Sequence, residues 1–202
     1  MNARMRLIRL VAMFVLLGVW MVSAGCSNKS TETSSTTPPP ESTTPAAPAL
    51  SDANIAAIVL AANDADIANG KQALSKSKDA DVKAFAQLMV TDHGATNDKA
   101  KALAGKLSLT PEDNETSNGI KAQQDSVRAM LKDKTGADFN KAYVDNEVSY
   151  HETVLGAIDQ ALIPNAQNAE LKQLLTDTRP VVAAHLDHAK QLQSKLTGTA
   201  AK

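Results

Sequence analysis

Five side chains that can bind a metal ion or exchange a proton occur in the middle of apolar helical stripes. One such stripe runs through the segment FNKAYVDNEVSYHETVLGAI, where apolar residues recur at intervals of three or four. Glu147 and His151 lie within this stripe rather than on the polar side of the helix. Three other segments place Asp66, His93 and His185 in the same way. If the four helices pack together, these side chains converge on one buried place.

Buried carboxylates and imidazoles require partners, because burying either group unpaired is costly. Two kinds of partner are open at this point. The five residues can form a hydrogen-bonded network that fixes the register of the helices, or they can hold one ion of zinc, iron or copper. A carboxylate-bridged di-iron pair is not expected, because such bundles use a Glu three residues before each His. Val90 and Val182 occupy those positions here.

Four further polar or aromatic residues lie near these stripes. His188 is expected at the exposed edge of its helix, and Asp92 on a different face from His93. Tyr143 and Tyr150 are expected to be core or boundary aromatics, with the hydroxyl of Tyr150 able to hydrogen-bond a metal ligand.

The sequence contains no recognisable catalytic motif. It has no glycine-rich phosphate loop and no serine in a nucleophile motif, and its one cysteine lies near the N-terminus. We therefore predict no catalytic residue. A non-enzymatic binding or structural module is the first expectation, and a protein that senses or handles one transition metal is the alternative.

The elements that must position these side chains are helices. A content of 3% aromatic residues, with abundant Ala, Leu and Lys, favours helices over strands. The pattern predicts long helices over residues 51–74, 79–107, 137–162 and 166–196, and a shorter one over 120–134 that follows a loop at 108–119. Met130 and Val181 are expected on inner faces, and Pro180 is expected to kink the last helix. The prediction is an all-α four-helix bundle with an extra short helix in the crossover between the second and third long helices.

The first 25 residues have the organisation of a secretory signal. Three arginines precede an apolar run that is shorter than the roughly 20 residues of a membrane-spanning helix. Cys26 follows small residues, and the segment VSAGC resembles the lipobox of bacterial lipoproteins, with Ser23 in place of the more common Leu. We expect residues 1–25 to be removed and Cys26 to carry a lipid anchor.

The remaining chain divides into a linker, a domain and a tail. Ser, Thr and Pro make up 16 of the 24 residues from Ser27 to Leu50, so residues 26–50 are expected to be a disordered tether that carries the lipidated cysteine. Residues 51–197 are expected to form the bundle, and residues 198–202 a disordered tail.

The net charge and the expected lipid anchor limit which classes of partner are expected. The chain carries a net charge of −1, and loss of the three arginines of the signal leaves −4. No basic face is present, so nucleic acid is not an expected partner. The expected partners are a membrane, through the lipid on Cys26, and an envelope protein. Ser27, rather than Asp, after the cysteine favours the outer membrane, with the domain facing the periplasm.

Four segments of the domain resemble a known family. ADIANGKQAL, VKAFAQLMVTDHGATNDKAKALA, FNKAYVDNEVSYHETV and LKQLLTDTRPVVAAHLDHAKQL are similar to the blocks of the bacterial domain-of-unknown-function family 4142. The most specific pieces are MVTDH, the Phe-x-x-x-Tyr that precedes His151, and the proline five residues before His185. Family members commonly carry Glu where this chain has Asp66. The resemblance implies a ferritin-like helical fold in the cell envelope and no established activity.

Overall fold

The computed structural model describes residues 50–199. They belong to one compact unit, Ala46–Lys202. The predicted signal, Cys26 and the linker up to residue 49 lie outside the described residues, as do residues 200–202. Among residues 50–199, no helix is both long and apolar enough to span a membrane.

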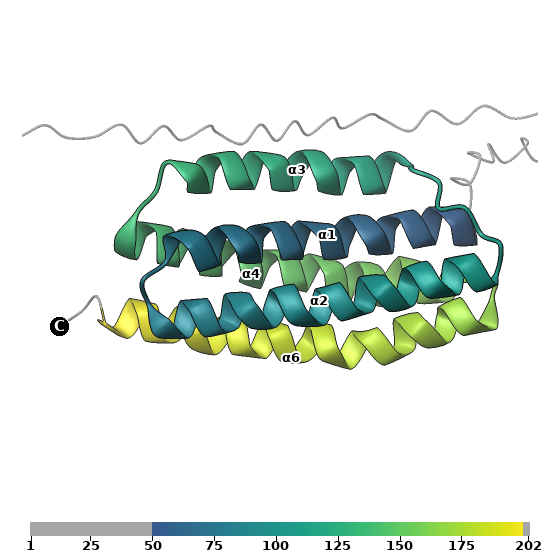
Figure 1. Ribbon diagram of the computed structural model, residues 1–202. Helices are drawn as coiled ribbons and strands as arrows, with labels where there is room; N and C mark the ends of the chain where they lie inside the picture. The colour runs from purple at the N-terminus through teal and green to yellow at the C-terminus, as the bar shows by residue number, and fades with distance from the viewer. Residues whose placement is uncertain (1–49, 200–202) are drawn as a thin grey trace, which may run out of the picture. The chain divides into compact units, whose positions relative to one another are not determined.

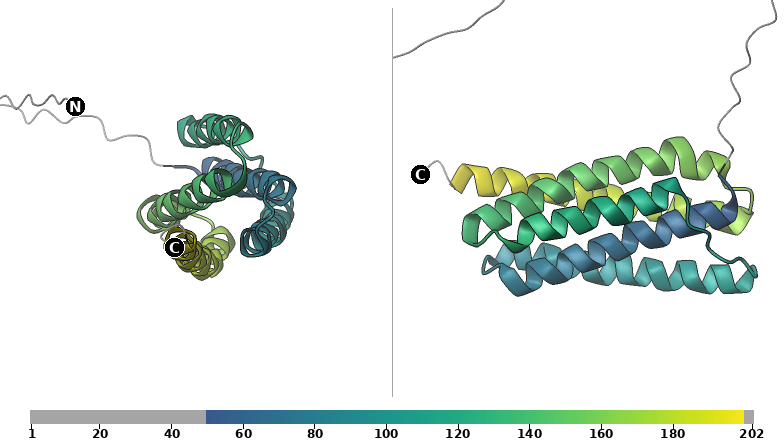
Figure 2. Two further views of the ribbon diagram at one scale, coloured as in Figure 1. Left: turned by 90° about the vertical axis from the view of Figure 1, so that its left-hand side faces the viewer. Right: turned by 90° about the horizontal axis from the view of Figure 1, so that it is seen from above.

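Four long helices pack as two antiparallel pairs, with a shorter helix beside them (Figures 1 and 2). The helices are α1 (Asp52–Lys76), α2 (Ala80–Lys106), α3 (Glu115–Lys132), α4 (Gly136–Ala157), the π-helical turn η1 (Ile158–Leu162), α5 (Ile163–Asn165) and α6 (Ala169–Thr199). α1 packs along α2 and α4 along α6, while α3 lies outside along α1. The predicted all-α bundle with an extra helix in the crossover is confirmed, and its ferritin-like topology stays a prediction.

Side-chain caps explain where the first helices begin. The Oγ of Ser51 accepts a hydrogen bond from the amide of Asn54, and the carboxylate of Asp79 accepts from the amides of Asp81 and Val82. These bonds satisfy amides that have no partner within a helix. The predicted starts of α1 and α2 are therefore correct to within about one residue.

The predicted loop at 108–119 is too long, because α3 begins at Glu115. Asn114 and Ser117 form a reciprocal capping box, in which each side chain accepts a hydrogen bond from the backbone of the other. Asn114 also donates from its side chain to the carbonyl oxygen of Asn54, at 3.2 Å. A polar stretch that resembles a loop in composition is thus the first turn of a helix that is fixed to α1.

The last helix begins later and ends later than predicted. Its first turn is capped by the Oδ1 of Asn168, which accepts from the amides of Glu170 and Leu171. α6 then continues through Pro180 to Thr199. The proline therefore does not end the helix, although it removes one backbone donor.

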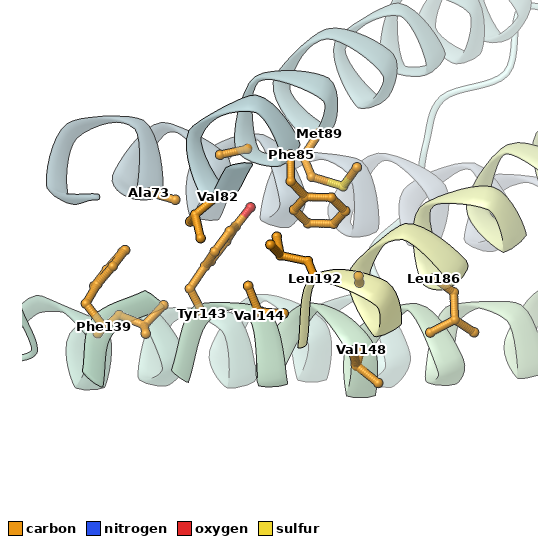
Figure 3. Packing of buried hydrophobic residues seen from close by; sticks show 13 residues of the cluster. Ala73, Val82, Phe85, Met89, Phe139, Tyr143, Val144, Val148, Leu186 and Leu192 are labelled. Carbon is orange, nitrogen blue, oxygen red and sulfur yellow. The ribbon is translucent and has the colours of Figure 1, made fainter. Parts of the chain in front are cut away.

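Two apolar clusters form the core at different levels of the bundle. The first contains Phe85, Phe139 and Tyr143, whose rings pack with centroid distances of 6.3 Å (Phe85–Tyr143) and 6.2 Å (Phe139–Tyr143) (Figure 3). The second is aliphatic and includes Ile55 and Leu175. A polar layer separates the two clusters along all four long helices.

Two residues predicted on inner faces are exposed instead. Met130 of α3 is 44% exposed and Val181 of α6 is 39% exposed. The neighbouring residues Leu131 and Val182 are buried in their place. One position along a helix is a rotation of about 100°, which is enough to move a side chain out of a narrow contact.

Gly70 allows α1 and α2 to approach closely. A Cβ atom at this position would lie 2.9 Å from the carbonyl oxygen of Ala86 and 3.0 Å from Cγ2 of Val90. The first contact is with backbone, which cannot move without shifting α2. Any larger residue must therefore separate the two helices.

We predict that Gly70→Ala lowers the free energy of unfolding by about 1–2 kcal/mol. Overpacking costs about 1–3 kcal/mol, and the better helix propensity of alanine offsets up to about 1 kcal/mol of that cost. Gly94→Ala is the matched control, because a Cβ there has no neighbour within 4 Å, and it should raise stability by up to about 1 kcal/mol. Denaturant unfolding measures both, and equal effects of the two substitutions would contradict the packing argument.

Candidate metal centre

The structure brings the five predicted residues into the polar layer between the two apolar clusters. Asp66 comes from α1, His93 from α2, Glu147 and His151 from α4, and His185 from α6. None of the five is more than 5% exposed. Apolar neighbours on either side, such as Met89 one turn before His93, keep the layer away from water.

The three histidine rings face one another. Their centroids lie 5.2 Å apart for His93 and His185, and 5.7 Å apart for the two pairs that include His151. One nitrogen from each ring lies within 4.8 Å of those of the other two. Two nitrogens bound to one tetrahedral ion at about 2.1 Å lie about 3.4 Å apart, so the rings must move inward to complete a three-histidine site.

Each histidine uses its outer nitrogen for a hydrogen bond to an oxygen. His93 Nδ1 lies 2.8 Å from Asn63 Oδ1, and His151 Nδ1 lies 2.9 Å from the carbonyl oxygen of Glu147. Each of these oxygens is an acceptor, so each outer nitrogen carries the proton.

His185 also hydrogen-bonds an oxygen through its outer nitrogen, which in this ring is Nε2 rather than Nδ1. Its Nε2 lies 2.9 Å from Asp92 Oδ2. The inner nitrogens of the trio, His93 Nε2, His151 Nε2 and His185 Nδ1, are buried and have no hydrogen-bond partner. An imidazole that donates from one nitrogen and presents the lone pair of the other is the form that binds metal ions.

The two carboxyl groups lie against each other, and a hydrogen bond between the side chains of Asp66 and Glu147 contributes to the pKa shifts of both. When both groups are ionised, Asp66 Oδ1 and both carboxyl oxygens of Glu147 are buried without a hydrogen-bond donor. Asp66 Oδ2 lies 3.5 Å from His93 Nε2, and Glu147 Oε2 lies 3.6 Å from His151 Nδ1. Asp66, Glu147 and His151 form a second group whose ligand atoms lie within 4.8 Å of one another.

Burial decides the protonation of all five groups. It raises the pKa of Glu147 to about 8, and it raises the pKa of Asp66 well above its ordinary range, with the charge of Glu147 adding to the effect. Burial lowers the pKa of His151 to about 4 and the pKa of His93 well below its ordinary range. It also lowers the pKa of His185, an effect that the hydrogen bond to Asp92 partly offsets. At neutral pH the imidazoles are neutral and the carboxyl pair retains a proton.

Six buried nitrogen and oxygen atoms of the five residues lack a hydrogen-bond partner, and their residues form two adjoining groups that share His151. The six atoms are Asp66 Oδ1, Glu147 Oε1 and Oε2, His93 Nε2, His151 Nε2 and His185 Nδ1. A buried polar atom without a partner costs about 1–3 kcal/mol, and native proteins rarely leave several together. A cation bound by the three histidines would engage their inner nitrogens, and the carboxylates of Asp66 and Glu147 lie in the adjoining group, which shares His151.

Sequence reasoning missed two residues of the centre. Asp92 was expected on another face from His93, but α6 packs against that face and its His185 binds the Asp92 carboxylate. Asn63 was not identified, although it lies three residues before Asp66 and therefore on the same helical face. The periodicity within α1 could have found Asn63. The pairing of Asp92 with His185 depends on the packing of α2 against α6, which are far apart in the sequence.

Tyr143, Tyr150 and His188 border the centre but are not among its candidate ligands. Tyr150 donates its hydroxyl to the carbonyl oxygen of Ala62 at 3.2 Å, so it does not hydrogen-bond a candidate ligand. The hydroxyl of Tyr143 is buried without a partner. His188 is exposed, as expected, with its ring centroid 5.1 Å from that of Phe85.

Comparison with known proteins places the chain in one family and gives no described activity. The family model "Domain of unknown function (DUF4142)" matches residues 37–192. Neither the curated proteins nor the solved structures include a significant match to this chain. The match covers more than half of the sequence, including all five residues of the centre. The chain therefore belongs to the DUF4142 family of proteins.

Proposed function

We propose that the protein binds one transition-metal ion in the polar layer of its bundle and serves to sense or handle that metal in the cell envelope. The observation that carries this proposal is the set of three buried, unpartnered nitrogens on His93, His151 and His185, with the carboxyl groups of Asp66 and Glu147 in the adjoining group. Hydrogen bonds from the outer histidine nitrogens orient the trio as they would in a metal site.

The donor set indicates both the number and the class of metal ions. Each histidine has only one free nitrogen, so the trio supplies three bonds to a single ion. Imidazole ligands suit iron, zinc and copper, and the addition of one or two carboxylates gives a set of four or five donors. Asp66 and Glu147 would also contribute negative charge that balances the cation.

The alternative function for these residues is a structural network that fixes helix register. Such a network is supported when its members satisfy one another. Here the network is only partly satisfied. Asp66 and Glu147 hydrogen-bond each other, but the contacts of Asp66 with His93 and of Glu147 with His151 are 3.5 and 3.6 Å long, beyond a good hydrogen bond. The three inner histidine nitrogens keep no partner, and the metal function accounts for them.

We also propose that a lipid on Cys26 holds the protein on the outer membrane, with the bundle facing the periplasm. Support comes from the sequence alone: a basic and apolar start, the segment VSAGC, and Ser27 after the cysteine. A tether rich in Ser, Thr and Pro would let the bundle reach metal ions or an envelope protein away from the membrane surface.

The first test is metal content. The protein, purified without a histidine tag, should retain close to one equivalent of iron, zinc or copper, and adding that metal to chelator-treated protein should raise its melting temperature. His93→Ala and His151→Ala should each reduce retained metal at least tenfold, because each removes one of the inner nitrogens. Elemental analysis and thermal melts provide the measurements.

His188→Ala is the matched control for both substitutions, because this histidine is exposed and outside the centre. It should keep the metal content and the melting shift of the unmodified protein. Absence of metal, together with no melting shift for any of the three ions, would overturn the proposal. If His188→Ala lost as much metal as His93→Ala and His151→Ala, the metal would be bound at the protein surface rather than in the centre.

In the metal-free protein, we predict that stability falls as the pH rises from about 6.5 to 8. The folded pKa of Glu147 is about 8 against an ordinary 4.5, so in this window the folded state holds a proton that the unfolded chain has lost. Between about pH 4.5 and 6.5 the depressed pKa of His151, about 4 against 6.5, gives a slope of opposite sign that offsets the slope from Glu147. Melting temperatures measured across pH 4–9 should therefore change little between about pH 4.5 and 6.5 and fall above pH 6.5.

Glu147→Gln should make the decline above pH 6.5 shallower, because glutamine does not titrate. Glu152→Gln, on the exposed side of α4, is the matched control and should leave the slope unchanged. If Glu147 instead stabilises the bundle as a charged member of a network, Glu147→Gln would lower the melting temperature at pH 8. That result would support the structural function.

The anchor has a separate test. The protein should sediment with membranes, and mass spectrometry should find an acylated cysteine at its mature N-terminus. Cys26→Ser should abolish the acyl mass and release the mature protein from the membrane fraction, while Ser27→Ala should leave both unchanged. Membrane association of the Cys26→Ser protein at the level of the unmodified protein would contradict the anchor.

A further inference from the structure

A cavity of about 120 Å³ lies against one side of the candidate centre. Its walls come from α1, α3, α4, η1 and α6, with His93 of α2, and its lining includes Asp66 and His93 of the centre. Asp66 Oδ1 and His93 Nε2 are both buried without a hydrogen-bond partner. The cavity thus contacts the centre at Asp66 and His93, whose unpartnered atoms are available to an incoming molecule.

The cavity walls are mainly aliphatic and carry no cation. Ile58, Ile120, Val154, Leu174 and Val182 supply much of the lining, which contains no lysine or arginine. An anion entering here would lose its hydration, meet no positive side chain and approach the Asp66 carboxyl group. The walls therefore favour an uncharged molecule.

The outer end of the cavity lies between α3 and α4. Thr116 and Gln123 of α3 and Thr153 of α4 line the cavity and are exposed. The polar centre is at the opposite, buried end. This arrangement gives a short route from the surface, between aliphatic walls, to the proposed metal.

We propose that this cavity is the binding site of a small uncharged molecule with an apolar body, which reaches the metal between Asp66 and His93. The inference rests on the proposed metal function and adds the class of ligand that the metal receives. The volume limits the size of the ligand: a cavity of about 150 Å³ lined by aliphatic and aromatic side chains holds benzene. A ligand of at most about six heavy atoms fits.

The cavity can be tested without metal. Benzene, added to the chelator-treated protein, should shift the methyl NMR signals of Ile58, Ile120 and Val182 and leave those of Leu131 and Leu192, in the other cluster, unchanged. Absence of these shifts up to the solubility limit of benzene would overturn the proposed ligand class.

Two substitutions should block the cavity from opposite walls. Ala157→Phe on α4 and Ala62→Phe on α1 each place a benzene-sized ring at a lining position. Each should weaken benzene binding at least tenfold. Ala102→Phe, at an exposed position of α2 outside the lining, is the matched control and should bind benzene as the unmodified protein does.

The link to the metal is tested with nitric oxide, a small uncharged molecule that binds iron(II) directly. The iron(II)-loaded protein should form a nitrosyl adduct detectable by electron paramagnetic resonance, and the two blocking substitutions should slow its formation at least tenfold with unchanged iron content. Adduct formation at the same rate in both blocked variants would overturn this inference alone. Failure of the unmodified protein to retain iron, zinc or copper would overturn the metal function and this inference together.

Discussion

The structure depends on the burial of one polar layer between two apolar clusters. All four long helices contribute an ionisable side chain to this layer, and the three inner histidine nitrogens in it have no hydrogen-bond partner. Each such atom costs about 1–3 kcal/mol, so these nitrogens oppose folding. Phe85 and Tyr143 on one side, and Ile55 and Leu175 on the other, must supply the apolar burial that holds the helices together around it.

The hydrogen bonds behind the histidines determine what the layer can do. Asn63, the backbone of Glu147 and the carboxylate of Asp92 each engage one outer nitrogen and leave the inner lone pairs free. The same residues that orient the imidazoles therefore leave three nitrogen lone pairs of the centre without a hydrogen-bond partner.

Helical periodicity was sufficient to predict the bundle and the inward direction of Asp66, Glu147 and His151, because each lies on a stripe that repeats over several turns. It could not predict the contact of Asp92 with His185, which depends on how α2 and α6 pack. It also missed the first turn of α3, where a capping box outweighs a loop-like composition. The sequence was sufficient to predict which way a residue faces on its own helix, whereas contacts between helices required the structure.

The position of α3 explains why the centre is approached from one side. α3 is attached to α1 largely by polar contacts, such as Asn69 Nδ2 to Gln124 Oε1 at 2.9 Å and Gln72 Nε2 to the carbonyl oxygen of Arg128 at 3.0 Å. Asn69 lies one turn after Asp66 on the same side of α1, so these bonds hold α3 beside the centre, where its residues Ile120 and Gln123 line the cavity. On the other side, the bond between Asp92 and His185 joins α2 to α6. One side of the polar layer is thus closed by a direct hydrogen bond, and the side toward α3 retains an aliphatic cavity.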